Sequence, residues 1–288
     1  MSGSPYLTMK DKTKLYTEIK EQGSPVWIVA THGIGEHLGR HRYLKDLFEH
    51  DFNICQYDLR NHGRSSGERS KVFDFNLFIE DLHEIILHLK ERYKMKRFIL
   101  FGHSMGALIT SAYIQQKADP EFYPERIFIN APTVGFPGAL GALVKSSPRG
   151  LWQRLAKLPM SIPLGGLIDL NDLSHNPEVG ERYAQDELNC LKLHSSLVLG
   201  MVKTSKEVFS RPIRPFCPAY VTVGTEDKLV NPSDLQTYFT MVEKAFHLQV
   251  IDGAYHEIHN DTEKYRAPYF EHMKSVFNEC RFHESLGN

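Results

Sequence analysis

Short apolar runs recur along this chain, and stretches of helical pattern separate most of them. Six runs are rich in β-branched and aromatic residues and do not alternate cleanly with polar ones, which is typical of strands buried on both faces. They are Val26–Thr31, Asn53–Tyr57, Arg97–Phe101, Arg126–Asn130, Ala219–Val223 and Phe246–Ile251. Because helical patterns lie between the runs, we expect an α/β fold with a mostly parallel sheet covered by helices on both faces.

The helical patterns place apolar residues three to four positions apart, as one face of a helix requires. The predicted helices cover residues 76–93, 104–116 and 232–245, and a fourth follows the capping pair Asp261-Thr262. Near the N-terminus, Tyr6–Met9 and Lys14–Lys20 have the character of an antiparallel hairpin. We expect this hairpin at one edge of the sheet.

Residues 132–215 interrupt the strand–helix alternation. The segment begins with prolines and glycines, including Pro132 and Gly135, and a proline-rich stretch ending at Pro218 closes it. We expect a helical cap, or lid, inserted into one core domain made of residues 1–131 and 216–288. A chain of 288 residues is long enough for one large domain with such an insertion.

The pentapeptide Gly102-His103-Ser104-Met105-Gly106 follows the third predicted strand and opens a predicted helix. It matches the pattern G-x-S-x-G in the strand–turn–helix context that this pattern needs. The glycines allow a sharp turn that exposes the Ser104 hydroxyl, and the helix N-terminus favours a nascent oxyanion. We therefore predict that Ser104 is a catalytic nucleophile rather than a structural turn residue.

A serine nucleophile needs a base, and the base needs an acid that orients it. In a sheet of this kind both follow later strands, in the chain order serine, acid, histidine. The loop after the fifth run contains Asp227, and the loop after the sixth contains His256. We assign Asp227 as the orienting acid and His256 as the general base. The alternatives are Glu226 or Asp252 for the acid and His259 for the base.

Four motifs together resemble the α/β-hydrolase superfamily, and within it the monoacylglycerol lipase and lysophospholipase group. They are His-Gly-x-Gly-Glu-His at 32–37, Gly-His-Ser-Met-Gly at 102–106, Gly-x-x-Asp-x-x-Val at 224–230 and Ala-Tyr-His-Glu at 254–257. The resemblance implies an eight-stranded sheet and a lid over a serine-hydrolase triad with an oxyanion hole. It also implies hydrolysis of esters that carry one acyl chain, with neither a cofactor nor a metal.

Two positions depart from the pattern of the resembled group. Asn61 stands in place of a glycine in the loop after the second run, and Ala107 replaces the glycine that often follows Ser-Met-Gly. Asparagine tolerates a left-handed backbone better than most residues, so we expect Asn61 to keep the turn. Neither departure touches the predicted triad.

In the resembled group, the loop after the first predicted strand supplies one oxyanion donor, and the residue after the nucleophile supplies the other. The donors are predicted to be the backbone N–H groups of Ile34 and Met105. Side chains of the same loop are expected to support it by hydrogen bonds and ion pairs, namely His32, Glu36, His37 and Arg40. The alternative for this loop is a metal site made of His32, Glu36, His37 and His41.

The stretch Thr133–Ile168 contains no acidic residue. Its basic residues, Lys145, Arg149, Arg154 and Lys157, lie among many apolar ones and the aromatic Trp152. A basic amphipathic segment of this kind suits peripheral contact with a membrane or the shelter of an acyl chain. The alternative is an ordinary lid whose basic side chains are solvated.

Composition narrows the class of protein further. A formal net charge of −1 gives no electrostatic reason to expect nucleic acid binding. The four cysteines lie far apart and form no C-x-x-C pair, which favours reduced thiols. The N-terminus lacks the apolar core of a signal peptide, and no run of about 18 apolar residues predicts a membrane-spanning helix. We expect a cytoplasmic protein, with peripheral membrane contact through the cap.

The favoured function is that of a serine ester hydrolase acting on a small amphiphile with one acyl chain. The same triad serves a thioesterase, a lactonase or a peptidase, and the sequence does not separate these reactions. A non-catalytic ligand-binding protein on this fold is the alternative outside enzymes. All three triad candidates are present, which favours an enzyme.

Overall fold

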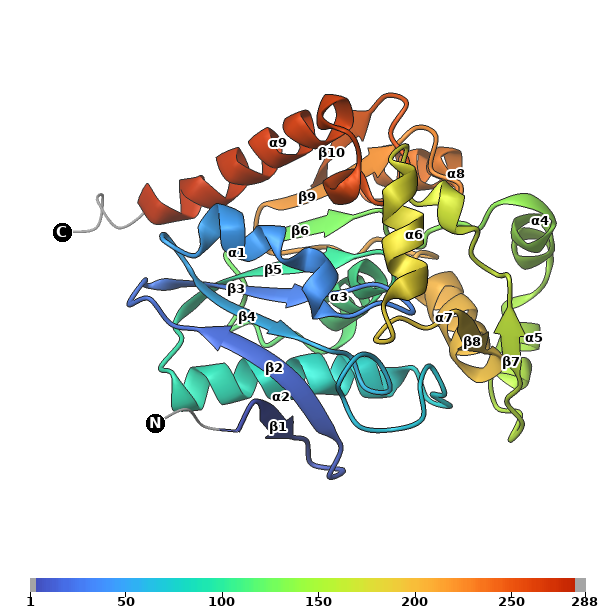
Figure 1. The fold of residues 1–288 in the computed structure, drawn as a ribbon, viewed down its shortest axis with the longest axis horizontal. Coiled ribbons are helices and arrows are strands. Elements are labelled where there is room, and N and C mark those ends of the chain that lie inside the picture. The colour runs from blue at the N-terminus through green and yellow to red at the C-terminus, as the bar shows by residue number, and fades with distance from the viewer. Residues whose placement is uncertain (1–3, 283–288) are drawn as a thin grey trace.

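The computed structural model describes residues 4–282, and a central eight-stranded sheet runs through this part of the chain (Figure 1). The strands are β1 (Tyr6–Thr8), β2 (Lys14–Lys20), β3 (Val26–Thr31), β4 (Asn53–Tyr57), β5 (Arg97–His103), β6 (Arg126–Asn130), β9 (Ala219–Gly224) and β10 (Phe246–Ile251). Their order is β1-β2-β4-β3-β5-β6-β9-β10, and the neighbours from β4 to β10 are parallel. β1 and β2 are added antiparallel at one edge. The predicted mostly parallel sheet and its edge hairpin are confirmed.

Helices cover both faces of the sheet because successive side chains of the central strands point to opposite sides. Val26 and Ile28 of β3 pack in one buried cluster with side chains of α1 (Tyr43–Phe48) and α9 (Glu263–Phe282). Trp27 and Val29 of the same strand belong to a second cluster, which α2 (Asn76–Arg92), α3 (Met105–Gln116) and α8 (Pro232–Thr237) complete. β3 is therefore buried on both faces, as its continuous apolar run predicts.

Several element boundaries differ from the sequence-based expectation, as two examples show. β5 continues to His103, so the strand reaches the residue before Ser104. The predicted helix over 232–245 consists of α8 followed by a π-helix, η3 (Tyr238–Val242). α1 and the short 3-10 helices η1 (Leu38–His41) and η4 (Ile258–Asn260) were not predicted, because segments this short leave little periodicity.

Residues 132–215 gather at the end of the sheet where the parallel strands finish (Figure 1). This segment holds α4 (Gly138–Ser146), α5 (Arg149–Leu155), β7 (Pro163–Gly165), η2 (Leu170–Asp172), α6 (Pro177–Gln185), β8 (Lys192–His194) and α7 (Ser195–Val208). It is mostly helical, as expected, but β7 and β8 pair in a small antiparallel sheet that the sequence did not predict. Three residues per strand are too few to leave a recognisable alternation.

The aromatic residue of the basic segment, Trp152, does not lie on the surface. Its side chain is buried in the main apolar cluster, and its indole N–H donates to Ser147 Oγ at 2.6 Å. A buried tryptophan with a satisfied N–H anchors α5 to the rest of the molecule. Within residues 4–282, no helix has both the length and the apolar character needed to cross a membrane.

Candidate active site

Ser104 lies in a strained turn between β5 and α3. Its backbone has φ of 52° and ψ of −115°, a conformation that residues with a side chain seldom adopt. The flanking glycines make this turn possible by packing closely. A Cβ on Gly106 would lie 2.2 Å from the carbonyl oxygen of Thr31, and one on Gly102 would lie 2.6 Å from the carbonyl oxygen of Gly106. The two glycines of the pentapeptide are therefore required because a side chain at either position would clash with a backbone carbonyl oxygen.

The structure brings Ser104, His256 and Asp227 together in a hydrogen-bonded row. His256 Nε2 lies 3.0 Å from Ser104 Oγ, and His256 Nδ1 lies 2.6 Å from Asp227 Oδ2. The other carboxylate oxygen of Asp227 accepts the N–H groups of Leu229 at 2.8 Å and Val230 at 3.0 Å. Each of these three residues is at most 5% exposed. The row has the geometry of a nucleophile, a base and an orienting acid.

Two opposing effects set the pKa of His256. Burial lowers this pKa, because it disfavours the charged imidazolium. The charge and hydrogen bond of the Asp227 carboxylate, with smaller contributions from Glu257 and Glu36, together outweigh burial, so the net pKa of His256 is raised above its usual range. The ring is therefore better able to hold a proton taken from the Ser104 hydroxyl than a free imidazole would be.

The alternative acids and the alternative base lie elsewhere. Glu226 is exposed, and Asp252 accepts a hydrogen bond from the Thr225 hydroxyl at 3.0 Å. His259 is buried, and neither of its ring nitrogens has a hydrogen-bond partner among the described residues. Its ring packs against His41, with the ring centroids 4.7 Å apart. None of these three residues hydrogen-bonds to Ser104 or His256.

The two predicted oxyanion donors belong to segments that lie next to Ser104. Ile34 lies in the loop of residues 32–37, here called the glycine loop, and a Cβ on its Gly33 would lie 3.2 Å from Ser104 Cβ. Met105 is the first residue of α3, where backbone N–H groups have no partner within the helix. Neither Ile34 N–H nor Met105 N–H donates to an atom of the described residues. Both amides are thus available to a ligand oxygen beside Ser104.

His32 holds the peptide unit that carries the Ile34 N–H. Leu59 N–H donates to His32 Nε2 at 2.9 Å, so the proton of the neutral ring is on Nδ1. This Nδ1–H donates to the carbonyl oxygen of Gly33 at 2.8 Å. Burial keeps the pKa of His32 well below its usual range, so the ring stays neutral and its tautomer is fixed.

Glu36 supports the glycine loop from within the core. One of its carboxylate oxygens accepts Gly33 N–H at 2.5 Å and the Nε2–H of His41 at 2.8 Å. Burial alone would raise the pKa of Glu36, but His41, with a contribution from Arg40, holds it well below its usual range. The carboxylate therefore remains ionised and continues to accept both hydrogen bonds.

Arg40 and His37 connect the loop to distant parts of the chain. Arg40 Nη2 pairs with Glu257, the residue after His256, and Arg40 Nε lies 3.3 Å from Glu36 Oε2. His37 Nε2 lies 2.8 Å from Asp186 at the end of α6. The ring nitrogens of the loop histidines thus have separate protein partners, and the residues described here include no group of three or more side chains arranged to bind a metal ion.

Sequence reasoning assigned no role in the site to several residues of this network. Tyr183, Asp186 and Cys190 contact the glycine loop from positions about 150 residues away in the chain. No local spacing marks such partners, so only the folded arrangement identifies them. His41 was considered only as a metal ligand, although its short distance in sequence from Glu36 was a usable signal.

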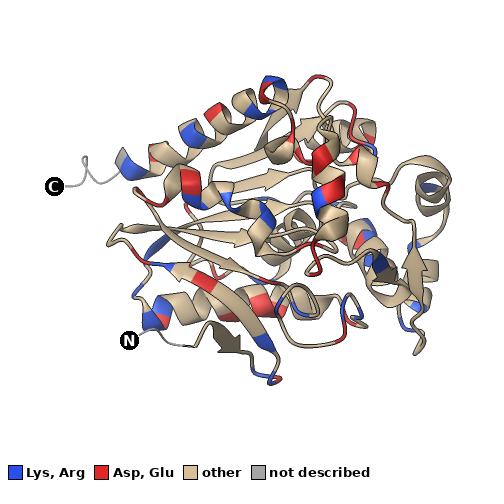
Figure 2. Ribbon diagram, viewed as in Figure 1, with Lys and Arg blue, Asp and Glu red and all other residues tan. Residues whose placement is uncertain are grey.

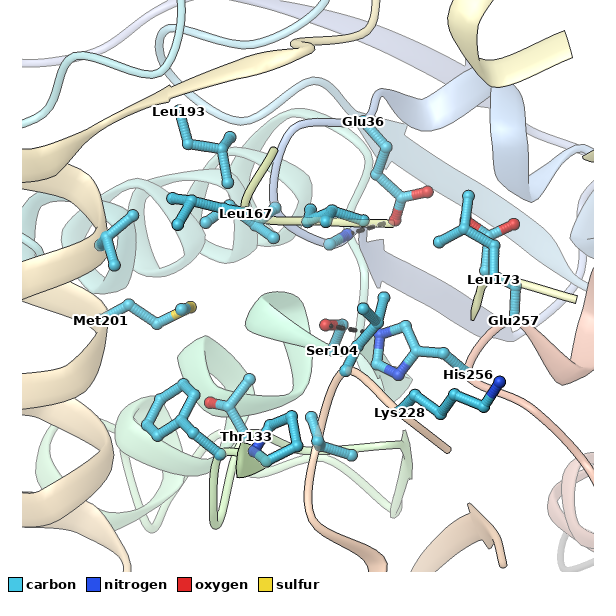
Figure 3. Close-up of a pocket in the computed structure, with 18 of the residues that line it drawn as sticks. Glu36, Ser104, Thr133, Leu167, Leu173, Leu193, Met201, Lys228, His256 and Glu257 are labelled. Atoms are coloured by element: carbon cyan, nitrogen blue, oxygen red, sulfur yellow. Dashed lines mark hydrogen bonds between the residues drawn. The ribbon is translucent and has the colours of Figure 1, made fainter. Parts of the chain in front are cut away.

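A cavity of about 330 Å³ lies beside Ser104 and His256 (Figure 3). Most of its wall is apolar, with side chains from residues 132–215 that include Phe136, Leu140, Leu167, Leu193 and Met201. Lys228 at the wall pairs with Asp172 at 3.0 Å, and Glu257 pairs with Arg40. Because these charged groups already have protein partners, the free part of the wall suits an apolar ligand.

The comparison with protein families decides what kind of protein this is. A family model described as "Serine aminopeptidase, S33" matches residues 25–263. The chain belongs to this S33 family. It is 27% identical over 240 residues to a monoacylglycerol lipase of Mycolicibacterium smegmatis, which covers 82% of this chain and 83% of the relative. It is 26% identical over 283 residues to the monoglyceride lipase of Homo sapiens, covering 96% and 88% of the two chains.

A solved structure agrees with the sequence comparisons. The monoacylglycerol lipase of Paleococcus ferrophilus superposes with a TM-score of 0.78 at 25% identity, over 91% of this chain and 97% of that one. This S33 family member therefore has the α/β-hydrolase fold and is a serine ester hydrolase. The resemblance to the monoacylglycerol lipase group is confirmed.

Proposed function

We propose that this S33 family member hydrolyses esters of single acyl chains, such as monoacylglycerols or lysophospholipids, through Ser104, His256 and Asp227. The observation that carries the proposal is the hydrogen-bonded row of these residues beside a mostly apolar cavity (Figure 3). An acyl chain fits the apolar wall, and the ester carbonyl then lies at Ser104. The names of the relatives, which are monoacylglycerol and monoglyceride lipases, support the same substrate class.

The reaction follows from the order of the hydrogen bonds. Ser104 Oγ attacks the acyl carbonyl carbon as His256 takes the hydroxyl proton, and Asp227 stabilises the imidazolium. The oxyanion accepts hydrogen bonds from Ile34 N–H and Met105 N–H. His256 then gives its proton to the leaving alcohol, which leaves an acyl group on Ser104. A water deprotonated by His256 attacks this acyl-enzyme, releases the fatty acid and restores Ser104.

A Ser104→Ala variant tests the proposal. A fluorophosphonate probe is expected to label the wild-type protein and not this variant. In a panel of p-nitrophenyl esters, monoacylglycerols and lysophospholipids, the substitution should lower kcat/KM by at least about 10³-fold. A folded wild-type protein that takes up no probe contradicts the proposal, and faster cleavage of an amino-acid p-nitroanilide than of any ester would favour a peptidase.

The oxyanion hole has its own test at Ile34. The proposed donor is the backbone N–H, so Ile34→Ala is expected to change kcat little. Ile34→Pro removes the N–H, and loss of one such donor costs about 10²–10³ in kcat. A fully active, folded proline variant would rule out Ile34 as a donor.

We further propose that residues 132–215 act as a cap on a core of residues 1–131 and 216–288, and that this cap touches membranes. Its outer surface exposes several large apolar side chains, including Leu143, Leu158, Met160, Ile162, Leu167 and Leu191. Arg149, Arg154 and Lys157 are exposed among them. The ribbon of α4 carries one basic residue, Lys145, and no acidic residue (Figure 2). Apolar side chains beside basic ones suit a surface of anionic lipid.

Vesicle binding tests the membrane proposal. The protein is expected to co-sediment with vesicles of phosphatidylserine and phosphatidylcholine, and the double variant Met160→Glu, Ile162→Glu is expected to lose this binding. Met241→Glu is a matched control, because Met241 in η3 is 70% exposed and Met160 is 72% exposed. Equal binding by all three proteins would remove the cap as the membrane contact.

A further inference from the structure

We propose that Tyr183, on helix α6 of the cap, positions the glycine loop for oxyanion stabilisation and is thus a positioning residue of the reaction. The inference rests on the proposed role of the Ile34 N–H in the oxyanion hole. It makes the cap a part of the catalytic apparatus and not only a cover over the cavity. Three sets of contacts carry it.

The first set is the double hydrogen bond at Gly35, the residue after Ile34. Tyr183 Oη–H donates to the carbonyl oxygen of Gly35 at 2.7 Å, and Cys190 N–H donates to the same oxygen at 2.7 Å. A carbonyl oxygen has two lone pairs, so both are occupied by donors from the cap. The cap therefore fixes the direction of the peptide unit that joins Gly35 to Glu36, which lies two peptide units after the one that carries the Ile34 N–H.

The second set holds the loop from the opposite side. Gly33 N–H and Gly33 C=O are bonded to Glu36 and His32, both of which are buried in the core. The residues Ile34 and Gly35 thus lie between a peptide unit held by the core, which joins Gly33 to Ile34, and one held by the cap, which joins Gly35 to Glu36. With both neighbours fixed, the orientation of the free Ile34 N–H depends on each anchor.

The third set keeps the Tyr183 hydroxyl in place. The guanidinium carbon of Arg40 lies 4.8 Å from the centroid of the Tyr183 ring, and Asn189 Nδ2 donates to the Tyr183 carbonyl at 3.0 Å. Gly35 has φ of +72°, and a Cβ there would lie 2.9 Å from Tyr183 Oη. The close approach of hydroxyl and loop therefore needs a glycine at this position. Burial raises the pKa of Tyr183 well above its usual range, so the hydroxyl remains a donor.

Removal of the hydroxyl should affect the transition state more than the bound substrate. The ground-state ester needs little from the oxyanion hole, whereas the tetrahedral intermediate depends on donors that are already aligned. Because complete loss of one donor costs about 10²–10³ in kcat, loss of one of its anchors should cost less, about 10-fold. A hydroxyl that instead contacted substrate directly would mainly change KM.

The test compares Tyr183→Phe with Tyr238→Phe. Phenylalanine keeps the ring and its contact with Arg40, so only the hydroxyl is lost. Tyr238 is a matched control, because its hydroxyl donates to the carbonyl oxygen of Arg211 at the same 2.7 Å and the residue is 4% exposed, against 3% for Tyr183. Thermal unfolding, kcat and KM are measured for p-nitrophenyl butyrate and for its thionoester, whose sulfur accepts hydrogen bonds poorly.

We expect both variants to lose a similar amount of thermal stability. Only Tyr183→Phe should lower kcat for the oxoester, about 10-fold with KM nearly unchanged, and it should lower kcat for the thionoester much less. Equal losses on the two esters, a change in KM alone, or kinetics like those of Tyr238→Phe would overturn the inference. If the wild-type protein cleaves neither ester, the proposed function itself fails, which is a distinguishable result.

Discussion

At the scale of single residues, the backbone of Ser104, the proposed nucleophile, is held at a cost in stability. Its backbone lies at φ 52° and ψ −115°, where a side chain is strained by about 1–3 kcal/mol. Ser104→Gly should relieve this strain, whereas Ser104→Ala should not. We expect the glycine variant to be more stable to urea than the alanine variant by about 1 kcal/mol, with both inactive. A less stable glycine variant would show that the turn is not strained.

The pKa of His256 predicts how activity depends on pH. A general base works only when it is unprotonated, so activity should fall as the pH drops through this pKa. Because Asp227 raises the pKa of His256, the midpoint of the acid limb of kcat/KM should lie above the usual histidine value of about 6.5.

The variant Asp227→Asn separates the effect of the carboxylate from that of burial. It should move the midpoint to lower pH and reduce kcat by about 10⁴-fold, since the ring loses its orienting acceptor. Asp252→Asn changes the other aspartate considered for this role and should leave both quantities unchanged. An unshifted midpoint in Asp227→Asn would contradict the assigned cause of the raised pKa.

The sequence indicated some residues of the candidate site and gave no role to others. The G-x-S-x-G context and the chain order pointed to Ser104, Asp227 and His256, and the structure brings these three together. Asn61 keeps a left-handed backbone at φ 61°, as expected for the residue in place of glycine. The sequence assigned no role to Tyr183, because a single tyrosine in a helix has the same pattern whether or not its hydroxyl bonds to a distant carbonyl.

At the scale of elements, the segment after η2 is clasped to the loop that carries His256. Glu257 N–H donates to the carbonyl oxygen of Leu173 at 2.8 Å, and His175 Nδ1 lies 3.0 Å from Asp261 Oδ2. The Asp261 side chain is fully buried and also accepts the backbone N–H groups of His175 and Thr262. This clasp couples the cap to the catalytic loop.

Asp261→Ala tests the clasp. It leaves buried donors without an acceptor, which costs about 1–3 kcal/mol of unfolding free energy. The loosened loop should also lower kcat several-fold. Asp119→Ala removes an exposed aspartate that accepts one backbone N–H at 2.9 Å, and it should be nearly neutral. Urea unfolding of both variants checks the difference, and equal stabilities would argue against the clasp.

The central strands and the helices that cover the sheet were predicted best. The strands form continuous apolar runs of clear length, and the helices have apolar residues at a clear period. β7 and β8 were not predicted, because each has three residues and their pairing joins positions about 30 residues apart. The π-helix η3 was not predicted either, because no sequence pattern distinguishes it from an α-helix. Its residues continue the apolar pattern of α8, so the sequence indicated one longer helix.

At the scale of the whole molecule, stability is unevenly distributed between the sheet and the cap. α4 and α5 each bury a single residue, Val144 and Trp152, whereas α3 buries most of its length. Elements with few buried contacts open at low free energy. Trypsin is therefore expected to cut first after Arg149, Arg154 or Lys157, all of which are exposed.

Mass spectrometry of the early fragments checks this order of cleavage. Anionic vesicles should slow the cuts if the cap binds them, while neutral vesicles should have less effect. First cuts in the exposed turns of the sheet region, such as after Lys94, would contradict the expected difference in stability.

The course of the chain through the sheet has a consequence for how substrate range can change. β6 and β9 are parallel neighbours, so the connection between them must cross back to the starting end of the sheet. The helix α7, which packs beside α3, forms this crossover. The segment from residue 132 to the start of α7 is an insertion that contributes no strand to the main sheet. We expect that a graft of another sequence in this segment reshapes the cavity while every strand pairing of the main sheet stays the same. Only a graft that again supplies donors to Gly35 would inherit the full rate along with the new specificity.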